Sequence, residues 1–225
     1  MNDDVTELDM RVAERVAVVR DRIARAGGLD VDVLPVTKLF GIEHCRAAIR
    51  AGCTAVGENY AQEVVAKFAA GRPPFAVHFI GQLQTNKVRA LAPLIDVYES
   101  VDRPSLVAEL AKRVPGATVL VQVACATEPG KGGCAVAEVP ALVEAASALG
   151  LHVRGLMTVG PTIGGAEAGR AGFRVVRELT DRLGLQVCSM GMTDDLEVAV
   201  QEGSTQVRVG SALFGERPVS AGLVR

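Results

Sequence analysis

The chain of 225 residues is 49% hydrophobic and 22% charged, with a net charge of −2. This balance predicts one large folded domain or two small ones and excludes a wholly disordered chain. The most apolar stretch, Ala117–Ala126, is too short to cross a membrane, the acidic start lacks the apolar core of a secretory signal, and the absence of a basic block argues against nucleic-acid binding.

Cysteines and histidines are few and scattered. The five cysteines form no CxxC pair, so we expect no disulfide framework. The three histidines lack the spacing of metal ligands, so we expect no metal site. These features predict a cytoplasmic protein with reduced thiols.

The first predicted element is a helix, Asp3–Arg25, in which apolar residues recur every three or four positions. We expect residues 1–28 to pack on the rest of the domain, across its N-terminal end. Eight valine-rich apolar runs follow and are predicted to be strands: Val31–Thr37, Thr54–Gly57, Ala76–Gly81, Asp96–Ser100, Thr118–Ala124, Val153–Val159, Leu185–Met190 and Gln206–Gly210. The stretches between them are mostly amphipathic and are predicted to be helices: Ile42–Ala51, Ala61–Ala70, Asn86–Ala92, Pro104–Arg113, Val136–Leu149, Glu167–Leu183 and Leu196–Glu202.

Apolar runs without polar alternation are typical of parallel strands that are buried on both faces. Eight such strand–helix units predict a single (β/α)8 TIM barrel, with residues 1–225 forming one domain. The alternative is an open, doubly wound sheet, in which a glycine-rich dinucleotide turn usually follows the first strand. No GxGxxG follows Thr37, which favours the barrel.

Lys38 is the first candidate for chemistry, because barrel active sites lie where the strands end. The other lysines fall on predicted amphipathic helices (Lys67, Lys87 and Lys112) or in a glycine-rich loop (Lys131), whereas Lys38 closes an apolar strand. Burial favours the neutral form of an amine, and a Schiff base with a carbonyl compound needs that form. The alternative is a lysine that extends into solvent at the barrel rim.

Small and polar residues follow the seventh and eighth strands, where barrels often bind phosphate. The candidates are Ser189, Gly191, Gly210 and Ser211. The spacing of Asp194 and Glu197 predicts a capping box at the start of the intervening helix, and helix N-termini favour anions. Ordinary strand–helix turns are the alternative interpretation.

The first and eighth strands are neighbours in a closed barrel, so Lys38 can face this phosphate site. The predicted ligand is therefore an aldehyde-bearing phosphate ester, either pyridoxal 5′-phosphate (PLP) or a sugar phosphate. Arg208, in the eighth strand, favours PLP. A permanently charged guanidinium beside the pyridine nitrogen would keep that nitrogen unprotonated and restrain the cofactor's chemistry. A salt bridge inside the barrel is the alternative role for Arg208.

Several longer motifs lie in order along the chain. They are Val36–Lys38, GENYAQE (57–63), HFIGQLQTNK (78–87), Arg154–Met157, SMGMTDD (189–195) and RVGSALFG (208–215). With these motifs the sequence resembles the YggS/PROSC family of PLP homeostasis proteins, which are related to the barrel domain of alanine racemase. The chain departs from the family pattern at Gln82, where proline is common, at Ser211, where threonine is common, and at Leu39-Phe40 after the lysine.

The resemblance implies a PLP-binding barrel of fold type III, with the cofactor on Lys38 as an internal aldimine. It implies phosphate contacts for Ser189, Gly191, Gly210 and Ser211, a place beside the pyridine nitrogen for Arg208, and pocket-lining places for Asn59, His78 and Met157.

The related racemases also need a tyrosine from a second domain of the partner subunit. The sequence ends at Arg225, shortly after the last motif, and neither Tyr60 nor Tyr98 lies in a matching context. We therefore expect a PLP-binding protein of intracellular vitamin B6 homeostasis and cofactor supply, without robust catalysis, that serves PLP-dependent apo-enzymes as a monomer or weak dimer. The alternatives are a PLP-dependent amino-acid racemase of narrow scope and, further removed, a Schiff-base aldolase for a sugar phosphate.

Overall fold

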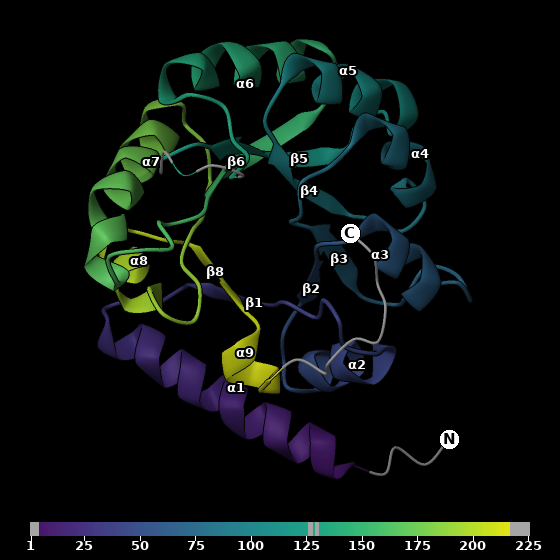
Figure 1. Ribbon diagram of the computed structural model, residues 1–225, viewed down its shortest axis with the longest axis vertical. Coiled ribbons are helices and arrows are strands. Elements are labelled where there is room, and N and C mark those ends of the chain that lie inside the picture. Colours follow the sequence, from purple (N-terminus) through teal and green to yellow (C-terminus); the bar gives the residue numbers. More distant parts are fainter. Residues whose placement is uncertain (1–4, 126–127, 129–130, 217–225) are drawn as a thin grey trace.

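Eight parallel strands form the centre of the computed structural model, which describes residues 5–125, 128 and 131–216 (Figure 1). The strands are β1 (Asp32–Pro35), β2 (Ala55–Glu58), β3 (Ala76–Phe79), β4 (Val97–Val101), β5 (Thr118–Val123), β6 (His152–Thr158), β7 (Val187–Ser189) and β8 (Gln206–Val209). Each predicted apolar run overlaps one of them, and β2, β4 and β6 extend one residue beyond the predicted bounds, at Glu58, Val101 and His152.

The sheet curls into a barrel, because β8 pairs with both β7 and β1. A parallel bridge between Val36 and Gly57 joins β1 to β2, and the Thr37 amide donates to the Gly57 carbonyl at 3.0 Å. The predicted (β/α)8 TIM barrel is therefore confirmed. Strand ends with the same polarity meet at one mouth of such a barrel, so residues that follow the strands gather there.

Helices surround the barrel (Figure 1). They are α1 (Glu7–Arg25), α2 (Ile42–Arg50), α3 (Ala61–Lys67), α4 (Val88–Leu91), α5 (Pro104–Arg113), α6 (Val139–Ala148), α7 (Arg170–Arg182), α8 (Leu196–Gln201) and α9 (Ser211–Phe214), with short 3-10 turns at Thr85–Lys87, Val136–Glu138 and Ala166–Gly169. The sequence did not predict α9, since a single turn has no periodicity to detect. Outward-facing strand residues such as Val56, Val77 and Val119 pack fully buried against the helices.

The first helix lies on the outside of the barrel. Its buried stripe, Val12, Val16, Val19 and Ile23, shares a core cluster with residues of α2, α8 and α9. The cluster also contains Val33 of β1 and Val207 and Val209 of β8, so the helix packs on the side of the barrel (Figure 1), and the expectation that it covers the N-terminal end is wrong. The predicted start of the helix, Asp3, lies outside the described residues.

A capping box begins α1. The Asp9 amide donates to Thr6 Oγ1 at 3.2 Å, and the Asp9 carboxylate accepts from the Thr6 amide at 2.9 Å. We expect Thr6→Ala to lower the free energy of unfolding by about 1 kcal/mol, because one helix amide loses its partner. Urea unfolding measures this change. Val5→Ala, at an exposed neighbouring position, serves as the control and should leave the midpoint unchanged.

Candidate functional site

Lys38 lies at the C-terminal mouth of the barrel, half-buried, in the turn that follows β1. The register pairs Pro35 with Val209, and a Cβ built on Gly210 would approach the Val36 carbonyl oxygen to 3.3 Å. The turn that carries Lys38 and the turn that carries Ser211 therefore leave the barrel side by side. The sequence predicted that these two turns lie close together, because the first and eighth strands are neighbours in a closed barrel.

Two hydroxyl groups meet at this mouth. Ser211 Oγ lies 3.3 Å from Thr193 Oγ1, in the loop between β7 and α8. In that loop Gly191 has a φ of +93°, and a Cβ there would come within 2.6 Å of the Ala199 Cβ, so only glycine fits. Sequence reasoning missed Thr193 as a site residue, although a hydroxyl two positions after a required glycine is the available signal.

The predicted capping box after β7 is wrong. The helix α8 starts at Leu196, and no side chain caps its first turn. Glu197 instead binds Arg22 of α1, with Oε1 2.6 Å from Nε, and a second nitrogen of Arg22 donates to the Thr193 carbonyl at 2.8 Å. The long-range ion pair outcompetes the local contact, and it ties α1 to the loop that carries Thr193.

Asn59 follows β2 at the same mouth. A Cβ at Gly81 would collide with the Asn59 carbonyl oxygen at 1.9 Å, so glycine is required where the two loops meet. The side-chain Oδ1 of Asn59 is buried without a hydrogen-bond partner among the described residues. A buried polar atom without a partner is costly, so Asn59 offers a contact to a bound ligand.

Arg208 lies inside the barrel, almost fully buried. Its guanidinium donates to the carbonyl oxygens of Ser189 and Thr158 at 2.8 and 2.6 Å, and to Ser189 Oγ at 2.8 Å. Burial lowers the pKa of Arg208, and the charges of Glu99 and Asp195 oppose that shift. Arg208 is thus a cation whose position is fixed by its neighbours, and its contact with the pyridine nitrogen stays a prediction. Ser189 is one of these neighbours and lies inside the barrel below the C-terminal mouth.

Glu99 is the fully buried counter-charge of this network. Its two carboxylate oxygens accept from Gln206 at 2.7 Å and from Ser189 at 2.8 Å, and the first also lies 2.6 Å from His78 Nδ1. Burial alone would raise the pKa of Glu99, but His78 and the Arg208 charge outweigh it and hold the pKa below its usual value. Sequence reasoning missed Glu99 and Gln206. The signal was a carboxylate within a predicted apolar strand.

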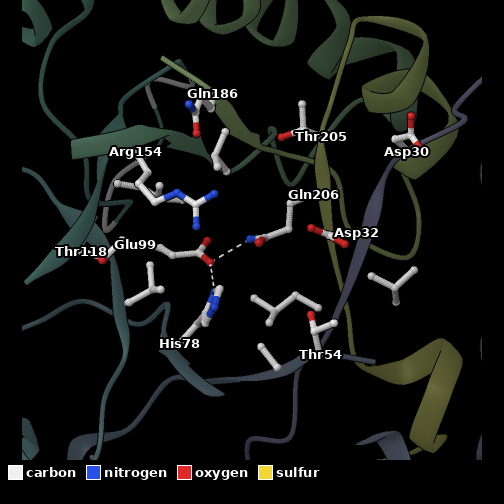
Figure 2. Close-up of a pocket in the computed structure, with 16 residues that line it drawn as sticks. Asp30, Asp32, Thr54, His78, Glu99, Thr118, Arg154, Gln186, Thr205 and Gln206 are labelled. Carbon is white, nitrogen blue, oxygen red and sulfur yellow. Dashed lines mark hydrogen bonds and ion pairs between the residues drawn. The ribbon is translucent and has the colours of Figure 1, made fainter. Parts of the chain in front are cut away.

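His78 faces the opposite end of the barrel from Lys38. It lines a cavity of about 400 Å³ at the N-terminal ends of the strands, together with Asp32, Glu99 and Gln206. Figure 2 shows His78 and Gln206 converging on Glu99 in this cavity. Met157 is fully buried in β6, level with Ser189 of β7. A contact of His78 or Met157 with a cofactor stays a prediction.

Two further expectations concern metals and membranes. Among residues 5–125, 128 and 131–216, no cluster of histidine, cysteine and carboxylate side chains is placed to hold a metal ion. Within those same ranges, no helix combines the length and the apolar character that a membrane crossing requires.

Known proteins share this barrel and its sequence. The family model described as alanine racemase, N-terminal domain, matches residues 10–218. The pyridoxal phosphate homeostasis protein of Pseudomonas aeruginosa is 41% identical over 224 residues, which cover 93% of this chain and 97% of that protein. Its counterpart in Aquifex aeolicus is 37% identical over 226 residues, or 92% of this chain and 99% of that protein.

A solved structure of PipY from Synechococcus elongatus, with PLP bound, superposes with a TM-score of 0.76 at 31% identity, covering 91% of this chain and 100% of that one. Both the sequence and the fold match over nearly the full length of these relatives. The chain therefore belongs to the family of pyridoxal phosphate homeostasis proteins, which share the N-terminal domain of alanine racemase.

Proposed function

We propose that this protein binds PLP at the C-terminal mouth of its barrel, holds it covalently through Lys38, and serves vitamin B6 homeostasis in the cytoplasm. The observation that carries the proposal is that the Lys38 turn and the Gly210–Ser211 turn leave β1 and β8 side by side. An amine beside an anion site suits an aldehyde-bearing phosphate ester. When bound, PLP supplies an electrophilic aldehyde and an electron sink.

The phosphate site in this proposal is built from the two turns after β7 and β8. The hydroxyls of Thr193 and Ser211 are 3.3 Å apart, and Gly191 and Gly210 let the backbone come close to an anion. We assign Ser189 to the support of Arg208, because its hydroxyl already contacts Glu99, Gln206 and Arg208 beneath the mouth.

The pyridine ring would lie toward the barrel axis in this proposal. Arg208 is fixed there as a buried cation, which suits a contact with an unprotonated ring nitrogen. Asn59 contributes its unpartnered amide oxygen, and Met157 an apolar wall. His78 reaches Arg208 only through Glu99, so we propose an indirect role for it.

The proposed role is storage and delivery of PLP to apo-forms of PLP-dependent enzymes, without robust catalysis. A cation at the ring nitrogen weakens the electron sink that racemisation needs. The related racemases also need a tyrosine, and Tyr98 is unsuited to that part. It is fully buried in the core between strands and helices, where burial raises the pKa of its hydroxyl. A narrow-scope amino-acid racemase is the second candidate, favoured by the match to a racemase domain.

Two measurements separate these functions. The PLP-loaded protein is mixed with an apo-enzyme that requires PLP, and activity regained by that enzyme reports delivery. Amino acids incubated with the loaded protein in deuterated water report racemisation by exchange of the α-proton. We expect delivery and negligible exchange; exchange at the turnover rates of ordinary enzymes, about 1 per second or faster, would instead establish the racemase.

The phosphate site makes a separate prediction. The double substitution Thr193→Ala and Ser211→Ala removes both hydroxyls and is expected to weaken PLP binding about tenfold or more, because a hydrogen bond to a charged group contributes about 1.5–3 kcal/mol. Equilibrium titration followed by absorbance measures the affinity. Ser147→Ala on the exposed face of α6 is the matched control. Equal affinity in the double variant and the control would remove these hydroxyls from the site.

A further inference from the structure

A buried charged cluster lies beneath the turn that carries Lys38. Lys67 of α3 places its Nζ 2.6 Å from Glu58 Oε1 and 2.9 Å from Glu63 Oε1, and only 5% of its side chain is exposed. Lys67 lies at the end of α3, within the predicted amphipathic helix, and its side chain turns inward to Glu58. Two carboxylates raise the pKa of Lys67 against the opposing effect of burial, so the lysine is charged.

The cluster holds the two peptide groups that flank the Lys38 Cα. On one side, Lys67 Nζ donates to the Thr37 carbonyl at 2.8 Å. On the other side, the Leu39 amide donates to Glu63 Oε1 at 2.6 Å. Rotation about both backbone bonds of Lys38 is thereby restricted, which fixes the direction of its Cα–Cβ bond.

The turn also contains unusual backbone geometry. Leu39 has a φ of +68°, and it is the one non-glycine residue with a positive φ in the described part of the chain. Such a conformation costs free energy and persists where surrounding contacts enforce it. The hydrogen bond from the Leu39 amide to Glu63 is such a contact. A third anchor comes from Thr37 Oγ1, which donates to Glu58 Oε1 at 2.6 Å.

We propose that Lys67, held by Glu58 and Glu63, is a positioning residue that aims the Lys38 amine at the aldehyde of PLP. This inference rests on the proposed function. A buried ion pair placed only for stability could lie anywhere in the core. The contacts of this cluster instead hold the peptide groups on both sides of Lys38. Burial of three charges is also expensive, which argues against a purely stabilising role.

The step that depends on this positioning is a condensation. The neutral amine of Lys38 adds to the aldehyde carbon of PLP, the aldehyde oxygen leaves as water with both amine protons, and a C=N bond remains. No electrons are exchanged with a third group. Such additions are sensitive to orientation, so a lysine that samples other directions attaches the cofactor more slowly.

The test compares Lys67→Met with wild type in two measurements. Pyridoxine 5′-phosphate carries an alcohol in place of the aldehyde, so its affinity reports the phosphate and ring contacts alone. The rate at which visible absorbance appears after mixing with PLP reports covalent attachment. We expect the rate to fall about tenfold or more, while the affinity for pyridoxine 5′-phosphate changes less than about twofold. Lys112→Met, on the exposed face of α5, should leave both unchanged.

Glu63→Gln provides a milder second variant, which keeps an acceptor for the Leu39 amide and removes the negative charge of Glu63 that faces Lys67. It should slow attachment severalfold, and it decides the question if Lys67→Met does not fold. An unchanged rate in a folded variant, or a loss of analogue affinity equal to the loss of rate, would overturn the inference. A wild-type protein that attaches no PLP would contradict the proposed function itself. That result differs from a variant that attaches PLP as fast as wild type, so the two failures can be told apart.

Discussion

Lys38→Ala is expected to abolish the retention of PLP through dialysis, while the wild-type protein keeps its cofactor. The reason is chemical: the phosphate and ring contacts remain in the variant, but no amine is left to form the bond with the aldehyde. Lys38 belongs to neither core cluster, so the apo-protein should keep its fold. Visible absorbance after dialysis measures retention.

The matched control is Lys112→Ala, which removes an exposed lysine from α5. It should retain PLP as the wild type does. Retention of the colour in Lys38→Ala would mean that another lysine carries the cofactor, and Lys131, which lies beside the Gly160 carbonyl, would be the next to replace.

Glu99→Gln is expected to lower the free energy of unfolding by about 3 kcal/mol, because it leaves the buried Arg208 without its main counter-charge. The amide that replaces the carboxylate also cannot accept all the hydrogen bonds that Ser189, Gln206 and His78 direct at Glu99. Urea unfolding at neutral pH measures the loss. Glu109→Gln, which breaks a surface pair with Arg113, should change stability by less than about 0.5 kcal/mol.

The effect of Glu99 depends on pH in a defined direction. The fold holds the pKa of Glu99 below its unfolded value of about 4.3. The ionised carboxylate therefore contributes its full stabilisation above that value and loses it as the pH falls through the folded pKa. The stability difference between the wild type and Glu99→Gln should narrow below about pH 4. A difference that stays constant, or one that is absent at neutral pH, would show that Glu99 does not balance Arg208.

The barrel could be predicted from the sequence because the evidence for each of its units lies within a short stretch of the chain. Each βα unit repeats an apolar run and an amphipathic stretch, and the number of units and the absence of a dinucleotide turn after Thr37 distinguished the barrel from an open sheet. Lys38 was found for a related reason: a lone cation that ends an apolar strand is visible without a structure.

Contacts between distant segments were harder to predict. Helical periodicity placed Lys67 on an amphipathic helix, but it could not show that its side chain meets Glu58 and the Lys38 turn. The spacing of Asp194 and Glu197 fits a capping box, yet Arg22, from the other end of the chain, takes Glu197. Local rules describe what a segment can do alone, and tertiary contacts decide between the options.

The barrel interior shows the same limit. Glu99 and Gln206 fall within predicted strands, but the sequence does not say which of their faces turns toward the axis. His78 was grouped with the cofactor residues, and its side chain lines the cavity at the N-terminal ends of the strands. The positions of inward-facing residues along the barrel axis depend on strand register, which is a property of the closed sheet.

Reduction of the PLP-loaded protein with borohydride, followed by mass mapping of its peptides, shows directly whether Lys38 carries the cofactor. Reduction converts the C=N bond to a stable amine and marks the lysine that carried the cofactor. We expect one modified residue, Lys38, and loss of the visible colour. A protein that remains unmodified after incubation with PLP, or one labelled on surface lysines without Lys38, would contradict it.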